Sequence, residues 1–158
     1  MTQLSNFTYD ELTLGQTAQY SKTVSAQDIT LFAMVSGDVN PVHLDPEFAS
    51  TTAFGECIAH GMLTGAIVSA ALAMVLPGPG TVYLGQSLRF RLPVKPDDTL
   101  KVALEVIDKK DRRHYVTLDC KVFNQMDKLV ASGTAEVIAP SRKLTIDAPA
   151  LPQINLAD

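Results

Sequence analysis

The sequence of 158 residues contains no tryptophan and only two cysteines, Cys57 and Cys120. Neither cysteine lies in a CxxC or mixed Cys/His spacing, so we expect free, buried thiols in a reducing compartment. Basic residues number 13 against 17 acidic ones, and the net charge is −4. The low cysteine content argues against a small domain that depends on disulfides, and the lack of a positively charged surface argues against a nucleic-acid partner.

A hydrophobic run long enough to span a membrane is also missing. The stretch from Cys57 to Leu88 has no charged side chain, but its predicted helix, residues 61–76, is 16 residues long before a Pro-Gly-Pro-Gly turn ends it. A spanning helix needs about 20 apolar residues, so the segment predicts a buried core helix. The polar N-terminus has no basic start followed by an apolar run, as a signal peptide would. We expect a cytoplasmic protein with no membrane partner.

The apolar periodicity is helical in the first half of the chain and two-residue in the second. Ser25 to Asp28 resembles a capping box, and Asp45-Pro46 is a second helix start. From residue 82 to residue 138 the pattern predicts four antiparallel strands, and residues 16–24 a further one. This order indicates an α+β fold in which a curled antiparallel sheet wraps one long central helix, the hot-dog arrangement. We expect a single domain over residues 1–139 and a C-terminal extension, of unknown role, over residues 140–158.

A short loop carries a carboxylate and an imidazole five residues apart, Asp38 and His43, with Asn40-Pro41 between them. Such a pair can hold one water molecule and can take and return its proton near neutral pH. Pro41 stiffens the loop, and the Asn40 amide is suited to hold it by a side-chain hydrogen bond. From the residue types alone, a solvated or structural Asp/His pair remains the alternative.

The start of the uncharged helix, at His60-Gly61-Met62, is the second segment that could take part in catalysis or binding. A helix N-terminus presents unpaired N–H groups and a partial positive charge. Gly61 has no Cβ, so a thioester carbonyl could approach its N–H closely; the alternative is that glycine serves packing only. Gly65 and Ser69 continue the same helix face, which could line an apolar tunnel or let the sheet approach.

Together these segments resemble one family. The pattern Asp38-x-Asn40-Pro41-x-His43, followed by His60-Gly61, is similar to that of the MaoC-like (R)-specific enoyl-CoA hydratases, which are hot-dog proteins. The likeness extends over residues 15–138. It implies a hydro-lyase that adds water across the double bond of trans-2-enoyl-CoA to give (R)-3-hydroxyacyl-CoA, or dehydrates in reverse. Such a step serves fatty acid metabolism or polyhydroxyalkanoate supply.

The resemblance also implies roles for individual residues. Asp38 and His43 would be catalytic, with the Gly61 N–H polarising the thioester carbonyl, while Asn40, Ser69 and His60 occupy substrate-binding positions. It implies an acyl-CoA substrate, with coenzyme A as part of that substrate, no metal or other cofactor, and a homodimer whose sheets join edge to edge. Two alternatives remain open, a hot-dog acyl-CoA thioesterase and a non-catalytic acyl-CoA binding module.

Overall fold

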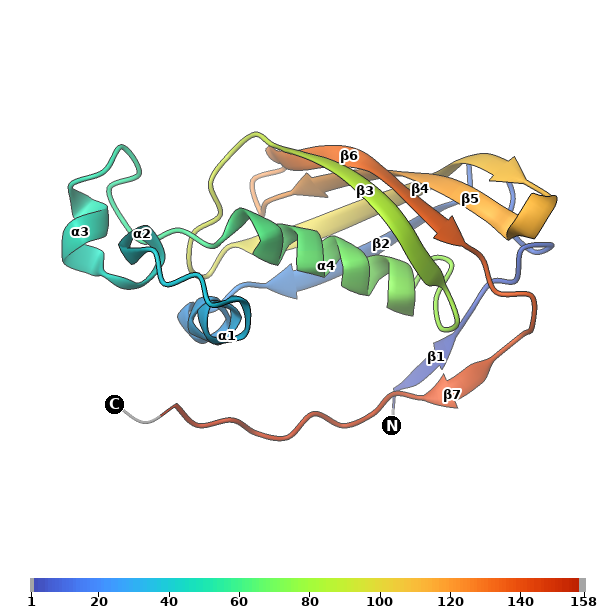
Figure 1. Cartoon of the computed structure of the whole chain (residues 1–158), viewed down its shortest axis with the longest axis horizontal. Coiled ribbons are helices and arrows are strands. Elements are labelled where there is room, and N and C mark those ends of the chain that lie inside the picture. The colour runs from blue at the N-terminus through green and yellow to red at the C-terminus, as the bar shows by residue number, and fades with distance from the viewer. Residues whose placement is uncertain (1, 157–158) are drawn as a thin grey trace.

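The structure is a computed structural model that describes residues 2–156, with a main sheet, a small second sheet and four α-helices in that range (Figure 1). The main sheet has the strand order β2-β4-β5-β6-β3, with every neighbouring pair antiparallel. Its strands are β2 (Thr17–Thr23), β3 (Val82–Phe90), β4 (Thr99–Lys110), β5 (Tyr115–Phe123) and β6 (Leu129–Ile138). The helices are α1 (Ala26–Ser36), α2 (Pro41–Leu44), α3 (Pro46–Ser50) and α4 (Gly61–Met74).

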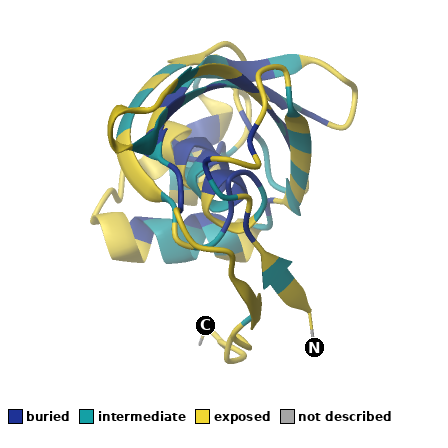
Figure 2. Ribbon diagram, turned by 90° about the vertical axis from the view of Figure 1, so that its right-hand side faces the viewer, coloured by how far each residue is buried: buried dark blue, intermediate teal, exposed yellow. Residues whose placement is uncertain are grey.

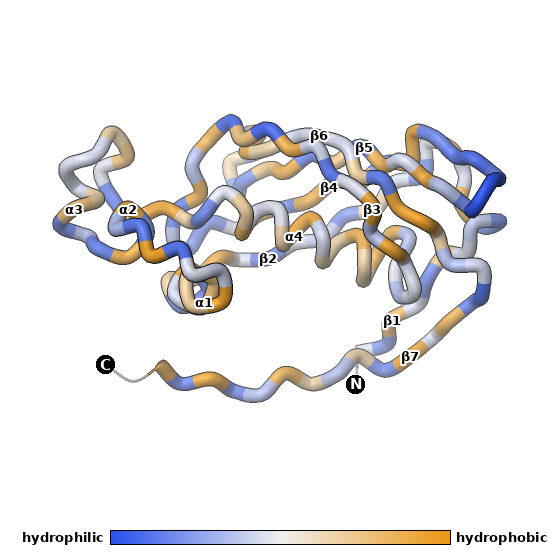
Figure 3. Tube along the Cα trace, viewed as in Figure 1, coloured by the Kyte–Doolittle hydropathy of each residue, from blue (hydrophilic) through white to orange (hydrophobic). Residues whose placement is uncertain are grey.

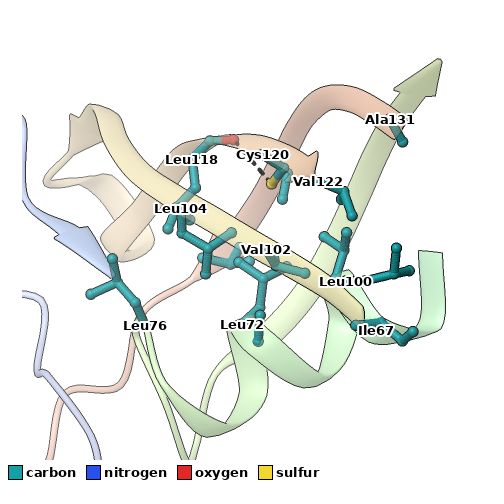
Figure 4. Packing of buried hydrophobic residues seen from close by; sticks show 14 of the residues in the cluster. Ile67, Leu72, Leu76, Leu100, Val102, Leu104, Leu118, Cys120, Val122 and Ala131 are labelled. Atoms are coloured by element: carbon teal, nitrogen blue, oxygen red, sulfur yellow. Dashed lines mark hydrogen bonds between the residues drawn. The ribbon is translucent and has the colours of Figure 1, made fainter. Parts of the chain in front are cut away.

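The main sheet curls around α4, which lies on its concave side (Figure 2). The predicted α+β arrangement, a curled antiparallel sheet around one long helix, is therefore confirmed. The sheet-facing side of α4 is buried, and Leu72 and the following Leu76 lie against Val102 and Leu104 of β4 (Figure 4). Burial of one such leucine contributes roughly 1.5–3 kcal/mol. The helix ends at Met74, two residues before the predicted end.

The central strands have the alternating burial that their sequences predict. In β5, the side chains that face α4 are buried and alternate with Thr117, Asp119 and Lys121 on the other face; the buried ones are Val116, Leu118, Cys120 and Val122. The hydropathy pattern along the tube in Figure 3 shows the same contrast between the sheet and the charged turn that joins β4 to β5. These strands form the core because they have neighbours on both sides and α4 beneath them.

The two cysteines differ in burial, and the uncharged helix is short. Both thiols are free; Cys120 is buried as expected, whereas Cys57 is only half-buried. Burial raises the pKa of Cys120 to about 11, so this thiol is neutral near pH 7. Among the described residues, no helix is both long and apolar enough to cross a membrane.

Strand β3 forms where the sequence predicts a strand, but its apolar side chains are less buried than those of β5. Its apolar side chains alternate in sequence as those of β5 do, but Val82, Leu84 and Phe90 are each about half exposed. The strand lies at the edge of the sheet and pairs only with β6, with a register shift between Tyr83 and Gly85. Sequence alternation reports which residues share a face, but burial also needs a neighbour on that face.

The C-terminal extension begins with a short strand and continues as an extended segment. Strand β7 (Thr145–Asp147) pairs with β1 (Gln3–Ser5) near the chain start, so residues 140–147 are tied to the N-terminus of the domain. The segment beyond β7 runs past α1 (Figure 1), where the Gln27 side chain donates a hydrogen bond of 2.8 Å to the Ile154 carbonyl. Residues 157–158 of the predicted extension lie outside the described part of the chain.

Candidate active site

The loop between α1 and α2 holds Asp38 by a series of local caps. Helix α1 ends at Gly37, whose φ of 78° is a left-handed conformation that glycine adopts without strain. Asn40 caps α2, because its Oδ1 accepts a hydrogen bond of 3.2 Å from the Val42 N–H. The Asn40 N–H in turn donates to Asp38 Oδ1 at 3.1 Å. The other carboxylate oxygen of Asp38 remains available, on a side chain that is half exposed.

His43, on α2, faces that oxygen. Its Nδ1 lies 2.7 Å from the Ile58 carbonyl, and because a carbonyl only accepts, Nδ1 carries the proton. The lone pair is therefore on Nε2, which lies 3.9 Å from Asp38 Oδ2. This distance is too long for a direct hydrogen bond, but two acceptors that share one water lie about 4 to 4.5 Å apart. The Asp38–His43 pair thus has the spacing to hold a single water molecule.

The N-terminus of α4 adds a backbone donor that has no partner among the described residues, one residue after His60, whose ring stacks on that of His43. His60 is the N-cap residue but makes no side-chain cap, and Gly61 is the first helical residue. No carbonyl of the helix can accept the Gly61 N–H, so the group points out of the helix end. Gly61 borders a groove of about 300 Å³, whose walls include Phe54, Ile58 and Phe90. A carbonyl oxygen that enters this groove can reach the positive end of α4.

The glycine face of α4 is close to strand β3. A Cβ on Gly61 would lie 3.2 Å from the Phe90 ring, and a Cβ on Gly65 would lie 3.0 Å from Met62 and 3.7 Å from Leu88. The small residues therefore let β3 approach the helix, while Gly61 also borders the groove. Gly61 therefore fits both alternatives: its lack of a Cβ lets β3 pack closely, and it leaves room for a ligand atom in the groove.

His60 is buried behind the Asp38–His43 pair, with 3% of its surface exposed. Its ring stacks on that of His43, with centroids 3.8 Å apart, and contacts Phe32 on another side. Its Nε2 lies 2.9 Å from the carbonyl oxygen of Asp38, so Nε2 carries the proton and donates. The predicted substrate contact of His60 stays a prediction; the contacts its ring makes are with the other site residues.

Five of the six predicted site residues are gathered at one end of the molecule: Asp38, Asn40, His43, His60 and Gly61. Ser69 is not among them, because it lies eight residues along α4, about 12 Å from Gly61 at 1.5 Å per residue. It is half-buried there. Its role as a substrate-binding residue therefore requires a substrate that extends along the helix.

Some groups at the site had no signal in the sequence. The Ile58 carbonyl sets the tautomer of His43, but a backbone carbonyl is available at any residue type. Phe90 comes from a distant strand, and its side chain borders the groove with that of Arg91. Arg91, beside Phe90, also lines the groove, whereas nearby Lys95 is paired with Glu56.

Donor atoms of Asp38, His43 and His60 all lie within 4.8 Å of one another, which raises the question of a metal ion. A histidine nitrogen binds a metal along its lone pair, in the plane of the ring. The two rings here are stacked with 27° between their planes, and one nitrogen of each is already hydrogen-bonded to a backbone carbonyl, that of Ile58 for His43 and that of Asp38 for His60. The same three side chains have the donors and acceptors that proton transfer requires, and the expected absence of a metal stays a prediction.

Comparison with known proteins gives a consistent set of relatives. The sequence profile described as "MaoC like domain" matches residues 11–124. An (R)-specific enoyl-CoA hydratase of Aeromonas caviae is 43% identical over 129 residues, which cover 82% of this chain and 96% of that protein. An (R)-specific enoyl-CoA hydratase of Rhodospirillum rubrum is 40% identical and covers 85% of this chain and 92% of its own length.

A solved structure is similar over nearly the whole chain. The unliganded R-hydratase of Pseudomonas aeruginosa superposes with a TM-score of 0.94 at 52% identity, covering 99% of this chain and 100% of that chain. The likeness inferred from sequence motifs stopped near residue 138. In this relative the likeness continues beyond that limit, because the match at 99% coverage takes in the β7 strand and the extended segment that follows it.

Proposed function

The chain belongs to the MaoC-like family, and from this premise we propose that it is an (R)-specific enoyl-CoA hydratase. It adds water to trans-2-enoyl-CoA to give (R)-3-hydroxyacyl-CoA, and catalyses the reverse dehydration. The observation that carries the proposal is the 3.9 Å gap between Asp38 Oδ2 and His43 Nε2. The N-terminus of α4 begins one residue after His60, whose ring stacks on that of His43. A proton-transfer pair and an oxyanion donor are what hydration of an enoyl thioester requires.

The proposed reaction uses only groups of this chain. The water between Asp38 and His43 loses a proton to the pair as its oxygen bonds to C3 of the substrate. The electrons of the double bond move toward the thioester carbonyl, and the Gly61 N–H stabilises the negative charge on that oxygen. The pair then returns a proton to C2, so one water is added in total. No step needs a metal or a redox cofactor.

We also propose that the enzyme is a cytoplasmic homodimer. The apolar side chains of the β3 edge are half exposed, and edge strands with free N–H and C=O groups pair readily with another strand. A second copy that adds its own β3 would cover Val82, Leu84 and Phe90. The two free thiols fit a reducing compartment. Sedimentation equilibrium tests the dimer, and the mass of a single chain at micromolar concentration would contradict it.

The first experiment measures the loss of enoyl-thioester absorbance when the purified protein is mixed with crotonyl-CoA. We expect fast loss, with a product that an (S)-specific 3-hydroxyacyl-CoA dehydrogenase does not oxidise. Asp38→Asn and His43→Ala should each lower kcat by about 10²- to 10⁴-fold at temperatures where the variants are folded, because proton transfer is lost. Near wild-type rates in both variants would overturn the assignment of the pair.

Two further measurements distinguish the hydratase from the thioesterase and from the acyl-CoA binding module. A thioesterase would release free coenzyme A from a saturated acyl-CoA, which a thiol-reactive dye detects. A binding module would bind acyl-CoA and turn over neither substrate. If crotonyl-CoA and longer enoyl-CoAs are all unchanged by the wild-type protein, the hydratase proposal is wrong.

A further inference from the structure

A buried histidine with no part in the proposed proton transfer lies between the two halves of the site. His60 is 3% exposed, and its Nδ1 has no hydrogen-bond partner among the described residues. Buried polar atoms are nearly always hydrogen-bonded, so an unpaired Nδ1 is unfavourable. The remaining contacts of the ring must therefore account for a histidine at this position. The other ring nitrogen makes one of these contacts, because Nε2 donates to the Asp38 carbonyl at 2.9 Å.

His60 joins two segments that are 22 residues apart in the chain. On one side it is bonded through the backbone to Gly61, the first residue of α4. On the other side, its ring holds the Asp38 carbonyl by a hydrogen bond and stacks on His43 at 3.8 Å between centroids. One side chain therefore contacts both members of the water-holding pair and adjoins the donor that faces the carbonyl.

We propose that His60 is a positioning residue, which fixes the Asp38–His43 pair relative to the Gly61 N–H by donating its Nε2–H to the Asp38 carbonyl. The inference rests on the proposed function, since hydration requires the water and the polarised carbonyl to be held at the same time. A misplacement of about 1 Å can lower the rate of such a reaction by about 10²-fold. The Asp38 side chain is half exposed and its loop lies at the surface, so the buried ring provides a rigid anchor.

A matched pair of substitutions tests the hydrogen bond. The amide nitrogen of glutamine lies about as far along the side chain as Nε2 of histidine, so His60→Gln keeps a donor within reach of the Asp38 carbonyl. Methionine is similar in length and shape but cannot donate. Both variants remove the aromatic ring, so the difference between them reports the donor alone.

We expect His60→Gln to keep kcat within about fivefold of the wild type, and His60→Met to lower it by at least about 30-fold. KM for crotonyl-CoA should change by less than about threefold in both, because the groove and the Gly61 N–H that bind the thioester are intact. A purely structural role for His60 would change Tm and leave kcat per folded molecule unaltered. Val116→Ala, a core substitution on β5, is the control that lowers Tm with an unchanged kcat.

Each outcome decides the inference. Equal kcat values for the Gln and Met variants, with an active wild type, would overturn it, since the donor would then have no effect. If His60→Met does not fold, His60→Phe replaces it, because Phe keeps a stacked ring and also lacks the donor; wild-type kcat in that variant overturns the inference as well. An inactive wild type would instead show that the proposed function is wrong, which the crotonyl-CoA assay reveals before any variant is made.

Discussion

Helices α1 and α4 begin in opposite ways. At α1, Ser25 Oγ accepts a hydrogen bond from the Asp28 N–H at 3.0 Å, and Asp28 Oδ2 accepts one from the Ser25 N–H at 2.8 Å. At α4, His60 makes no side-chain cap, and Gly61, the first helical residue, borders the groove. One helix start uses side chains to satisfy its free N–H groups, whereas the other has no side-chain cap.

The difference shows how the same backbone feature serves stability or chemistry. Every α-helix starts with unpaired N–H groups and a partial positive charge. A capping box satisfies these groups, and a carboxylate such as that of Asp28 complements the charge. An uncapped start keeps both for negative charge that develops during a reaction. Substitutions at α4 should therefore change activity, and those at α1 should change stability.

The largest effect is expected from Gly61→Pro, which removes the N–H at α4. Proline is well tolerated at the first helical position, and the φ and ψ of His60, −58° and 138°, suit a residue that precedes proline. Loss of one oxyanion donor lowers kcat by about 10²- to 10³-fold, and we expect this loss with a Tm close to that of the wild type. Crotonyl-CoA kinetics and thermal unfolding measure the two quantities.

Gly61→Ala is the control for the added atoms. It keeps the N–H but adds a Cβ 3.2 Å from the Phe90 ring, a contact that this half-exposed side chain can relieve by moving. We expect it to retain at least about tenfold more activity than Gly61→Pro, because the donor remains. Equal losses in both variants would show that Gly61 serves packing only, and the contrast between the two helix starts would then fail.

The second prediction concerns the capped start. Ser25→Ala removes the side-chain acceptor for the Asp28 N–H and should lower the free energy of unfolding by about 1 kcal/mol. For a domain of this size, that change lowers Tm by about 2–4 °C. We expect kcat to be unchanged. Unfolding should be measured at one chain concentration, because dissociation of a dimer makes Tm depend on it.

Ser25→Gly provides the matched control for this effect. Glycine is itself acceptable as an N-cap and should lower stability by only a few tenths of a kcal/mol. A loss of kcat in Ser25→Ala, at temperatures where the variant is folded, would show that the α1 start also positions the Asp38 loop.

These two helix starts also show what a sequence reveals. The capping box was predictable from Ser25 and Asp28, because the residues that make it are three positions apart and interact locally. The local structure of the loop from Asp38 to His43 was also predictable, because its hydrogen bonds join residues two positions apart in the chain. The stacking of His60 on His43 could not be predicted, because it depends on where the fold places the start of α4 relative to α2.

In the main sheet too, the sequence predicts the strands but not their neighbours. Strands β3 and β5 both have alternating apolar residues, and the sequence predicts both as strands correctly. Only the topology shows that β5 has two neighbours whereas β3 lies at the edge, with its apolar side chains half exposed. Local patterns thus specify elements and caps, but the surroundings of each element depend on contacts far apart in the chain.

The smallest expected effect concerns the charge of Asp28. Partial burial raises the pKa of this carboxyl, but the hydrogen bonds from Ser25 and Lys22 outweigh burial and lower it below its ordinary value of 3.8. A lowered pKa in the folded state means that the charged carboxylate stabilises the fold above about pH 4, and that this contribution is lost as the pH falls through the folded-state pKa. Asp28→Asn should therefore have a lower free energy of unfolding than the wild type at pH 7, and the loss should be smaller than that in Ser25→Ala. The difference in unfolding free energy between Asp28→Asn and the wild type should decrease toward pH 3. Urea unfolding of both proteins at pH 7, 5 and 3 measures it. A gap that widens on acidification would mean that the Asp28 carboxylate opposes folding, and the capped start of α1 would then owe its stability to Ser25 alone.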